Sequence, residues 1–497
     1  MNQSIWKAKA TATNYPELHE SIEADVCIVG GGITGITTAM QLKNSGKKVV
    51  LLEAMRIGDG TTGFSSNHLN TQIDFTYQEV TKKHNSDKAK IVAQSRSQAI
   101  DYIEEMINQH AINCDFKRVN GYLYAEKEKN QESIEQEFRY CEKVELPVEL
   151  SNDIPLPFKI NKTIVFANQA QFNSQQYLQG MAANLGNDCS IYENSRVIHY
   201  DHSEKKLITA NGSVKAEHVI LATHLPLFIN IHQTTAAPYR SYMITAKLEE
   251  YPPHGLYWDN MEPYHYTRVY EQDGEKWLVV GGADHKAGND DNNIDYFDQL
   301  EQYVRDRFPV LSIEHRWSSQ YYEPADGLPY IGNSPGGNTL MATGYSGDGL
   351  VYGTVAGIIL ADMVLQKKNK WQETYNSKRI PPLSAGKTYM KENVDVAKHL
   401  IMDRLRSSAK IDEIANGEGA LVDINSNRYA LHKDENGEIH VCSATCPHLG
   451  CLVKWNHMEK SWDCPCHGSR FTARGEIIIG PATRNLKKID IRDKVEN

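Results

Sequence analysis

Hydrophobic residues near the start of the chain form short blocks with two different spacings. Residues 25–29 are an apolar run that predicts a buried parallel strand, and residues 48–52 predict a second one. Between them lies a glycine-rich turn at residues 30–35. Apolar side chains then recur at helical spacing at Ile33, Ile36, Ala39 and Met40. The order strand, turn, helix, strand is typical of an α/β nucleotide-binding unit.

The glycines of this turn occur in the pattern G-x-G-x-x-G. Gly30 permits the tight turn, Gly32 allows the backbone to approach a pyrophosphate, and Gly35 allows the helix to pack closely on the strand. Free N–H groups at the helix N-terminus attract phosphate. Glu53 ends the second strand, where a carboxylate can accept the ribose hydroxyls. A chance glycine turn is the alternative, but the ordered elements around the glycines favour a dinucleotide site.

The C-terminal part has a pattern of short strands. Residues 420–424 and 428–432 are strand-like runs on either side of an Asn-Ser-Asn turn, and residues 439–442 follow a second turn. We therefore predict a small all-β domain at residues 405–497. The polar stretch before it, residues 371–404, contains two adjacent prolines and several lysines, which predicts an inter-domain linker.

Composition narrows the functional classes. Hydrophobic residues make up 40% of the 497-residue chain and charged residues 23%, which is ordinary for a globular protein. The net charge of −10 lacks the basic footprint of a nucleic-acid-binding protein. The longest apolar stretch, residues 350–361, is too short to cross a bilayer. No apolar leader is visible, and cysteines outside residues 442–466 are scattered, so we expect a cytoplasmic protein with no integral membrane segment.

Cysteine and histidine are paired twice at short spacing in the C-terminal domain. The first pair lies in the segment CPHLGC at residues 446–451, and the second lies in CPCHGS at residues 464–469. A [2Fe-2S] cluster with mixed ligation needs two thiolates on one iron and two imidazoles on the other. Cys446 and Cys464 would hold the first iron, and His448 and His467 the second. A zinc site is the alternative, because such spacings also bind zinc.

These two segments resemble the cluster loops of respiratory-type Rieske proteins. The resemblance implies that the extra cysteines, Cys451 and Cys466, could pair as a disulfide tying the two loops together. Ser469 matches a serine that donates a hydrogen bond to a bridging sulfide, and residues 480–482 (Gly-Pro-Ala) match the proline loop that covers the cluster. Phe471 stands where those proteins usually have a tyrosine bonded to a ligand thiolate, which implies a lower reduction potential.

The first 370 residues resemble the glycine oxidase, sarcosine oxidase and D-amino-acid oxidase family. The matching segments are GYSGDGL at 344–350, which precedes an apolar helix, DGLPYIG at 326–332, YENSRV at 192–197 and HVILAT at 218–223. The resemblance implies an α/β Rossmann-like FAD-binding domain with an inserted α+β substrate domain, followed by the all-β Rieske domain. It places FAD-binding parts at about 20–80, 190–230 and 325–370, and the substrate domain at about 81–189 and 231–324.

The same resemblance implies which residues contact FAD. FAD should be non-covalent, because no cysteine lies near residues 324–331, where monomeric sarcosine oxidases tether it. The expected cofactor-binding residues are Gly30, Gly32, Gly35, Glu53, Thr61, Thr62, Val197, Thr223, Gly344, Ser346, Gly347, Asp348, Gly349 and Leu350.

Candidate catalytic residues are fewer. His68 follows the phosphate-binding loop and is expected near the flavin ring, although a lone histidine is more often structural. Arg240 and Arg268 lie in segments resembling the substrate sheet, and either could grip a substrate carboxylate. Trp258, Tyr264 and Tyr266 could hold an amine by cation–π attraction, or serve only in packing.

We expect an FAD-dependent oxidoreductase that oxidises the C–N bond of a small amine or amino acid and passes electrons through the Rieske cluster to an external acceptor. A Rieske-type ring oxygenase is disfavoured, because it needs a mononuclear iron site and carries its Rieske domain first. A non-oxidase electron-transfer protein or an NAD(P)H-linked flavin/iron–sulfur reductase is the other alternative. Such reductases usually have a second dinucleotide fingerprint, and this chain has one.

Overall fold

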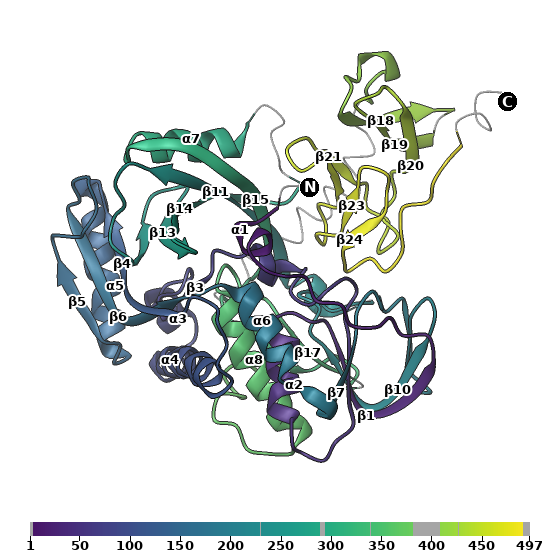
Figure 1. The fold of residues 1–497 in the computed structure, drawn as a ribbon, viewed down its shortest axis with the longest axis horizontal. Coiled ribbons are helices and arrows are strands. Elements are labelled where there is room, and N and C mark those ends of the chain that lie inside the picture. Colours follow the sequence, from purple (N-terminus) through teal and green to yellow (C-terminus); the bar gives the residue numbers. More distant parts are fainter. Residues whose placement is uncertain are drawn as a thin grey trace.

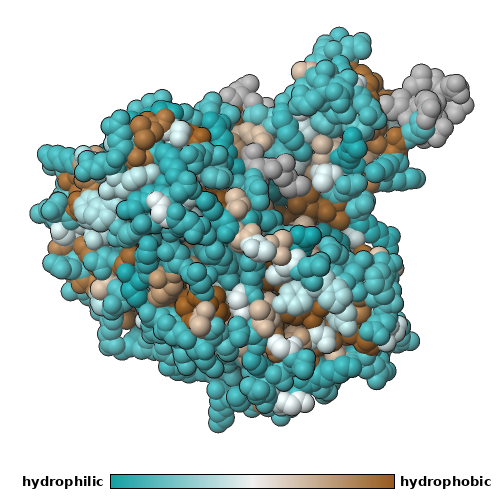
Figure 2. Space-filling model, viewed as in Figure 1, coloured by the Kyte–Doolittle hydropathy of each residue, from teal (hydrophilic) through white to brown (hydrophobic). Residues whose placement is uncertain are grey.

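The computed structural model describes residues 3–228, 230–288, 294–337, 339–380, 408–425 and 427–490. Two sheets organise the larger part of the molecule, and the C-terminal strands form a separate lobe at the upper right of the view (Figure 1). In the space-filling view this lobe projects from a mostly hydrophilic surface (Figure 2).

The first sheet is the predicted nucleotide-binding one. Its strands lie in the order β16-β17-β10-β1-β2-β7, and β8 and β9 extend it beside β10. Strands β17, β10, β1, β2 and β7 run parallel, whereas β16 is antiparallel to β17. The bounds are β1 (Ser21–Val29), β2 (Val49–Leu52), β7 (Cys189–Tyr192), β8 (His199–Asp201), β9 (Lys206–Ile208), β10 (Ser213–Leu221), β16 (Tyr330–Asn333) and β17 (Leu340–Thr343). Both strands and the helix expected around the glycine turn are confirmed.

Two helices pack tightly beside this sheet, α2 (Ile33–Leu42) and α8 (Gly349–Val364). Glycines on α8 permit the close approach. A Cβ added to Gly357 would lie 2.6 Å from the Cβ of Thr37, and one added to Gly353 would lie 2.5 Å from the Ile33 side chain. The apolar run expected as a buried helix is α8. Helix α6 (Ser174–Ala183) also packs on α2, although it falls within the range expected for the substrate domain.

The second sheet forms the substrate domain and has the order β15-β11-β14-β13-β12-β4-β6-β3, with β5 beside β6. Its bounds are β3 (His68–Leu69), β4 (Lys117–Ala125), β5 (Val148–Ser151), β6 (Lys162–Gln171), β11 (Ala236–Leu248), β12 (Leu256–Asp259), β13 (His265–Gln272), β14 (Glu275–Lys286) and β15 (Val310–Pro324). Helix α5 (Gln131–Lys143) packs on β4, β5 and β6, and α7 (Tyr296–Arg305) packs on β11 and β14. The remaining helices are α1 (Ile5–Ala8), α3 (Tyr77–Lys83) and α4 (Ser86–Gln109).

The C-terminal domain is all-β, as predicted. One sheet contains β18 (Glu418–Ile424), β19 (Asn427–Lys433) and β20 (Ile439–Ser443), which include the predicted hairpin. The other contains β21 (Lys454–Asn456), β22 (Ser461–Asp463), β23 (Arg470–Thr472) and β24 (Ile477–Ile479). The loops with the paired cysteines and histidines come before β21 and between β22 and β23.

The chain after α8 stays on the first sheet for longer than expected. Trp371 and Tyr375 are buried, and the Arg379 guanidinium forms a buried ion pair with Asp326 at 2.7 Å. The packed part of the first unit therefore extends to about residue 379, beyond the expected boundary at 370. Most of the predicted linker, residues 381–404, lies outside the described residues.

Candidate functional site

Two glycines of the turn, Gly30 and Gly35, lie so close to neighbouring backbone that no side chain would fit at either position. Gly30 has a φ of +112°, and a Cβ added there would lie 2.4 Å from the main-chain oxygen of Ala222. A Cβ on Gly35 would lie 1.9 Å from the oxygen of Gly30. Gly32 is the N-cap of α2, so the free N–H groups of this helix begin at the turn. These positions fit the roles predicted for a dinucleotide turn.

Glu53 lies at the end of β2, beside the turn. Its carboxylate accepts hydrogen bonds from the N–H of Gly31 at 2.7 Å and of Met55 at 2.8 Å. Burial raises the pKa of Glu53, while these two hydrogen bonds and the charge of Arg196 oppose the shift. The carboxylate is thus fixed by main-chain contacts, and free lone pairs remain for a ribose hydroxyl.

A single elongated cavity runs from this turn to the substrate sheet. Most of the expected cofactor residues line it. Those that do are Gly30, Gly32, Glu53, Thr61, Thr62, Val197, Thr223, Ser346, Gly347, Asp348, Gly349 and Leu350. Gly35 and Gly344 do not line it: Gly35 provides the close helix–strand contact, and Gly344 turns the chain after β17 with a φ of +75°. The cavity therefore has the lining expected of an FAD site.

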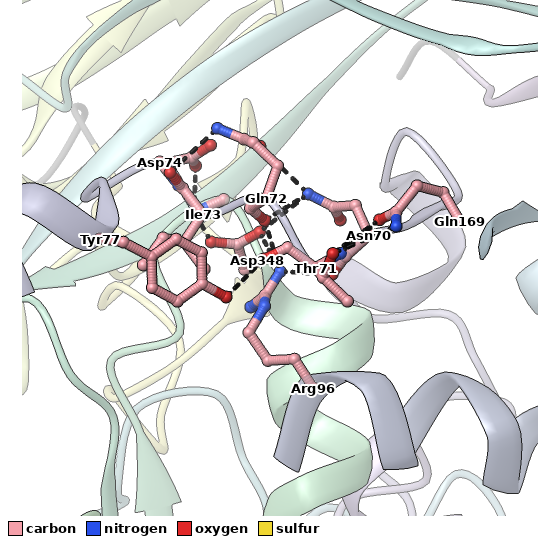
Figure 3. Close-up of polar contacts among 10 residues, drawn as sticks. Asn70, Thr71, Gln72, Ile73, Asp74, Tyr77, Arg96, Gln169 and Asp348 are labelled. Atoms are coloured by element: carbon pink, nitrogen blue, oxygen red, sulfur yellow. Dashed lines mark hydrogen bonds and ion pairs between the residues drawn. The ribbon is translucent and has the colours of Figure 1, made fainter. Parts of the chain in front are cut away.

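The N-terminus of α8 is held in place by a buried arginine that the sequence analysis missed. Arg96, on α4, contacts the Asp348 carboxylate at 2.8 Å and donates to the main-chain oxygens of Asn70 and Gln72 (Figure 3). The Arg96 side chain is fully buried, and that of Asp348 is 4% exposed. This ion pair fixes the α8 N-terminus, with its free N–H groups, against residues 70–74. It was not recognisable from sequence because Arg96 lies on a distant helix with no motif.

Hydroxyl groups of the loop after β2 face the same cavity. Thr62 accepts a hydrogen bond from the Ile33 N–H at 3.2 Å, and the Thr61 hydroxyl lies 3.1 Å from Nδ1 of His224. Burial lowers the pKa of His224 to about 4, so its imidazole is neutral at ordinary pH. The loop thus lies where a pyrophosphate would extend from the α2 N-terminus.

Of the three candidate catalytic residues, His68 is the one that lines the cavity. It lies between the rings of Trp258 and Tyr266, with centroids at 5.4 and 5.5 Å. Burial, and secondarily the charge of Arg268, holds the pKa of His68 well below 6.5. His68 is therefore a neutral group in the wall of the cavity.

The two candidate arginines are both buried but are placed elsewhere. Arg268 donates to the main-chain oxygens of Asn67 at 2.9 Å and Phe172 at 3.2 Å. Arg240 lies 2.8 Å from the carboxylate of Asp463, in the C-terminal domain. Neither is among the cavity-lining residues. The expectation that one of them grips a substrate carboxylate is not supported by this geometry: Arg268 supports the segment before His68, and Arg240 joins two domains.

The four expected cluster ligands come together in the C-terminal lobe. Cys446, Cys464 and His467 are nearly fully buried, and the rings of His448 and His467 are 5.0 Å apart and perpendicular. Nδ1 of each histidine is buried and has no hydrogen-bond partner among the described residues. Burial lowers the pKa of both imidazoles to about 4, so both are in the neutral form that binds metal. Two orphaned nitrogens beside two thiols fit a [2Fe-2S] cluster with mixed ligation.

The residues around these ligands match the Rieske pattern. Cys451 and Cys466 form the expected disulfide, with an S–S distance of 2.05 Å. The Ser469 hydroxyl accepts a hydrogen bond from the N–H of Ala482 at 3.0 Å, which brings the proline loop against the second cluster loop. Phe471 is fully buried in the same apolar core as Cys446 and Cys464.

The cluster domain contacts the other domains through its ligand loops. Nε2 of His448 lies 3.0 Å from Oε1 of Gln233, and the Tyr322 hydroxyl donates to the main-chain oxygen of His467 at 3.1 Å. Gln320 donates to the main-chain oxygen of Gly468 at 2.9 Å. Residues at and after β24 also line the elongated cavity; they are Ile478, Ile479, Gly480 and Ala482. The two candidate cofactor sites are therefore adjacent.

Several cavity residues carried no recognisable signal in the sequence. Asp74 lies in no motif, Arg196 lies in a matching segment but had no role assigned to it, and Ser241 and Tyr321 lie in strands whose register is decided by tertiary pairing. Gly480 was expected only beside the cluster, and no role was predicted for Ile478 and Ile479. Such contacts depend on how distant segments are brought together, so periodicity cannot reveal them.

The fold and the two sites define a flavin-dependent oxidoreductase joined to an iron–sulfur domain. Residues 25–363 match the family of FAD dependent oxidoreductases, and residues 407–490 match the Rieske [2Fe-2S] domain. The chain belongs to this FAD-dependent oxidoreductase family and carries a C-terminal Rieske domain. Its cofactors are accordingly FAD and a [2Fe-2S] cluster, so zinc is not the metal of this domain.

Known proteins similar to this chain include one that spans its whole length and others that cover the flavin-binding part. The putative Rieske 2Fe-2S iron-sulfur protein YhfW of Bacillus subtilis is 33% identical over 497 residues, which cover 98% of each chain. Gamma-glutamylputrescine oxidoreductase of Escherichia coli is 25% identical over 371 residues, covering 70% of this chain and 85% of the relative. The crystal structure of glycine oxidase from Geobacillus kaustophilus has the same fold over 72% of this chain and 99% of that one, with a TM-score of 0.61 and 18% identity.

Within the described ranges, no helix is both long enough and apolar enough to cross a bilayer.

Proposed function

We propose that this enzyme oxidises the C–N bond of a small amine or amino acid and delivers the electrons through its own Rieske cluster to an external acceptor. When bound, FAD supplies the two-electron acceptor, and the cluster supplies a one-electron carrier. The substrate loses a hydride from carbon and a proton from nitrogen, and the resulting imine is hydrolysed by water. The two electrons then leave one at a time. The similarity to gamma-glutamylputrescine oxidoreductase supports an amine-type substrate.

The observation that carries this proposal is the shared wall between the flavin cavity and the cluster domain. Tyr321 of β15 lines the cavity, and the next residue, Tyr322, bonds to the main chain of His467. The ring of His224, which also lines the cavity, lies 4.6 Å from the ring of Tyr322. Two aromatic side chains and one hydrogen bond therefore connect the cavity to a candidate cluster ligand. This short connection supports electron transfer within the docked structure.

The protein's own side chains prepare the reaction in three ways. Glu53 and the glycine turn position the nucleotide end of the cofactor, and the Arg96–Asp348 pair fixes the α8 N-terminus. The rings of Trp258 and Tyr266 enclose His68 and form a mostly apolar wall that excludes water from the reacting carbon. Positioning and exclusion of water are thus the roles we assign to this chain.

Anaerobic rapid mixing of the holoenzyme with an amine substrate tests the proposal. Flavin absorbance should fall first, and the EPR signal of the reduced Rieske cluster should rise afterwards, at a rate independent of protein concentration because both sites share one chain. Full flavin reduction with a cluster that stays oxidised throughout turnover would refute the proposed electron route.

A matched pair of variants locates the route. Tyr322→Phe removes the hydroxyl that bonds to His467 and should slow cluster reduction while leaving flavin reduction unchanged. Tyr140→Phe removes a hydroxyl on α5, far from both sites in sequence and outside the cavity lining, and should change neither phase. Equal rates in wild type and Tyr322→Phe would show that this hydrogen bond does not contribute.

The compartment is part of the same proposal. We propose a cytoplasmic location because Cys27, Cys114, Cys141, Cys189 and Cys442 are free thiols, a usage typical of reducing compartments. The Cys451–Cys466 disulfide, buried beside the cluster ligands, is the exception. Mass spectrometry of thiols alkylated in intact cells would test both statements.

A further inference from the structure

The half of the cavity that faces the substrate sheet has a distinctive chemistry, and the inference drawn from it rests on the proposed function. Its walls come from β3, β11, β12, β13 and β15 and from the segment after β3. The lining residues that carry the argument are His68, Asp74, Trp258, Tyr264, Tyr266 and Tyr321. Four aromatic rings and one carboxylate thus surround the space beyond the flavin position.

Among the described residues, no arginine or lysine lines this half of the cavity to meet a substrate carboxylate. Of the described residues that line the cavity, Arg196 is the only arginine or lysine, and it lies at the nucleotide end, where its charge acts on Glu53. Arg96 is paired with Asp348, and Arg240 with Asp463. Arg268 is committed to the main-chain oxygens of Asn67 and Phe172. An α-amino-acid carboxylate placed in this half would find no partner of opposite charge.

Negative groups are concentrated in the same half. Asp74 is exposed to the cavity, and in the described parts of the chain no ion pair is formed with it. Its Oδ2 accepts a hydrogen bond from the Gly347 N–H at 3.1 Å, so this oxygen faces the N-terminal end of α8. Asp284 lies behind the wall and accepts a hydrogen bond from the Tyr321 hydroxyl at 2.8 Å. The aromatic wall is therefore backed by a second carboxylate.

The negative charges of Asp74 and Asp284 are poorly solvated in this half of the cavity. Burial, together with the neighbouring carboxylates Asp348 and Asp284, raises the pKa of Asp74 well above its usual value. Burial raises the pKa of Asp284 to about 6. A cation bound between these groups would relieve the repulsion between them.

His68 adds a neutral imidazole ring to the same wall. The His68 side chain is 7% exposed, lines the cavity, and its Nε2 has no hydrogen-bond partner within the described structure. Nε2 itself has almost no surface open to the cavity, so the ring contributes to the wall as an uncharged imidazole with no committed hydrogen bond at this atom. The ring is neutral because burial keeps its pKa low, so it offers no repulsion to a cation.

We infer that this half of the cavity binds an organic cation, an alkylamine without a carboxylate on its reacting carbon, with Asp74 as the counter-ion and the rings of Trp258, Tyr264 and Tyr266 as cation–π walls. Aromatic faces and a carboxylate together are the recognised means of holding an ammonium group. α-Amino acids are excluded by the same chemistry, because their carboxylate would approach Asp74 with no compensating arginine.

Equilibrium binding tests the inference without turnover. Choline and 3,3-dimethylbutan-1-ol have nearly the same shape but differ in charge, and the flavin absorbance spectrum of the holoenzyme can report the binding of each. Choline should bind at least about tenfold more tightly than the neutral isostere, and acetate should not compete with it. Equal affinities for choline and its isostere, or tighter binding of acetate, would overturn the inference.

Two variants assign the preference to Asp74. Asp74→Asn should abolish the tenfold preference and leave the affinity for the neutral isostere unchanged, whereas Asp74→Glu should retain a preference for the cation. Glu204→Gln, which removes an exposed carboxylate outside the cavity, is the matched control and should behave as wild type. An unchanged preference in an Asp74→Asn protein that still binds FAD would overturn the assignment.

Anaerobic flavin bleaching separates this inference from the proposed function. N-Methylbutylamine and 1,4-diaminobutane should bleach the flavin, whereas sarcosine, glycine and D-alanine at equal concentration should not. Bleaching by the amino acids alone would overturn the inference and keep the proposed function. Choline binding without bleaching by any amine or amino acid would keep the inference and refute the proposed function.

Discussion

Arg240 and Asp463 form an ion pair between the substrate sheet and the cluster domain. Their charged groups are 2.8 Å apart, and the two side chains are 1% and 3% exposed. Burial opposes ionisation of Asp463, but the charges of Arg240 and Arg470 outweigh it and hold its pKa below the usual value. Since Asp463 directly precedes the candidate ligand Cys464, this pair fixes the second cluster loop against the substrate sheet.

Removing one partner of this pair should weaken the domain contact. Arg240→Ala leaves a buried carboxylate supported by Arg470 alone, and loss of one partner from a buried pair costs ~3 kcal/mol. A protease site placed within residues 381–407 would separate the chain into two parts. After cleavage, the wild-type parts should co-elute in size-exclusion chromatography, and the Arg240→Ala parts should separate.

The control for this experiment is an exposed arginine. Arg316 pairs with Glu301 on the surface, with 39% of its side chain exposed, and surface pairs contribute little. Arg316→Ala parts should therefore remain associated. Arg240→Ala parts that co-elute as wild type would contradict a structural role for the buried pair.

Replacement of a candidate ligand should remove the cluster signal. In His467→Ala the second iron loses one of its two imidazoles, so the Rieske EPR spectrum should disappear while FAD remains bound. His457→Ala, a partly exposed histidine of the same domain, should keep the spectrum. A normal Rieske spectrum in His467→Ala would show that another residue is the ligand.

The sequence predicted what depends on local pattern, and it missed what depends on tertiary contact. The glycine turn, the helix after it and the cluster loops were found because their function requires fixed residue types at fixed spacing. Arg240 shows the opposite case. The segment around Arg240 resembled a strand of the substrate sheet, and Arg240 does lie on β11. Its ion pair with Asp463, however, forms only because the cluster domain docks against this strand.

His68 and Asp74 illustrate the same limit within the cavity. His68 was predicted near the flavin because it follows a recognisable loop, and it lines the cavity. Asp74 lies six residues later in a segment with no periodicity, and its exposure to the cavity is set by the Arg96–Asp348 pair. Arg96 and Asp348 lie 22 and 274 positions further along the chain than Asp74. Because they determine where the Asp74 carboxylate lies, no local sequence pattern reveals its position.

The reduction potential of the cluster should respond to residue 471. Phe471 is fully buried in the same apolar core as the ligand cysteines, and we expect a hydroxyl added by Phe471→Tyr to bond to a ligand sulfur. A hydrogen bond to sulfur stabilises the reduced cluster and raises the potential, within a Rieske range of about −150 to +300 mV. Protein-film voltammetry should give a higher midpoint for the variant. A lower or unchanged midpoint in a folded variant would contradict this orientation of the side chain.

Binding of a permanent cation should strengthen as the pH rises. The carboxylates of Asp348, Asp284 and Glu323 raise the pKa of Asp74 in addition to the effect of burial, while Arg96 opposes them. A cation binds the ionised form, so affinity for choline should fall by up to about tenfold per pH unit below this raised pKa and level off above it.

The same titration in Asp74→Asn identifies the responsible group. Its choline affinity should be low and nearly independent of pH, because His68 stays neutral and contributes no charge. Isothermal titration calorimetry in buffers of different ionisation enthalpy should also detect proton release on binding to wild type and none to the variant. A pH dependence that survives in Asp74→Asn would assign the effect to another group.

The flavin should be released by acid. Within the described structure no cysteine lines the cavity, and we expect a non-covalent cofactor. Precipitation with trichloroacetic acid should leave a colourless pellet and place all the FAD in the supernatant, as checked by chromatography against an FAD standard. A yellow pellet would demonstrate a covalent bond.

The position of β24 leads us to expect a fixed order in the maturation of this enzyme. Ile478, Ile479 and Gly480 form part of the wall around the flavin cavity, and Arg196, from the nucleotide-binding domain, lies 3.4 Å from the main-chain oxygen of Ile478. If the C-terminal lobe docks before FAD binds, these three residues would cover one side of the cavity and hinder FAD from entering. We therefore expect FAD to be inserted first during biosynthesis and retained afterwards, so that each molecule keeps one flavin for its lifetime.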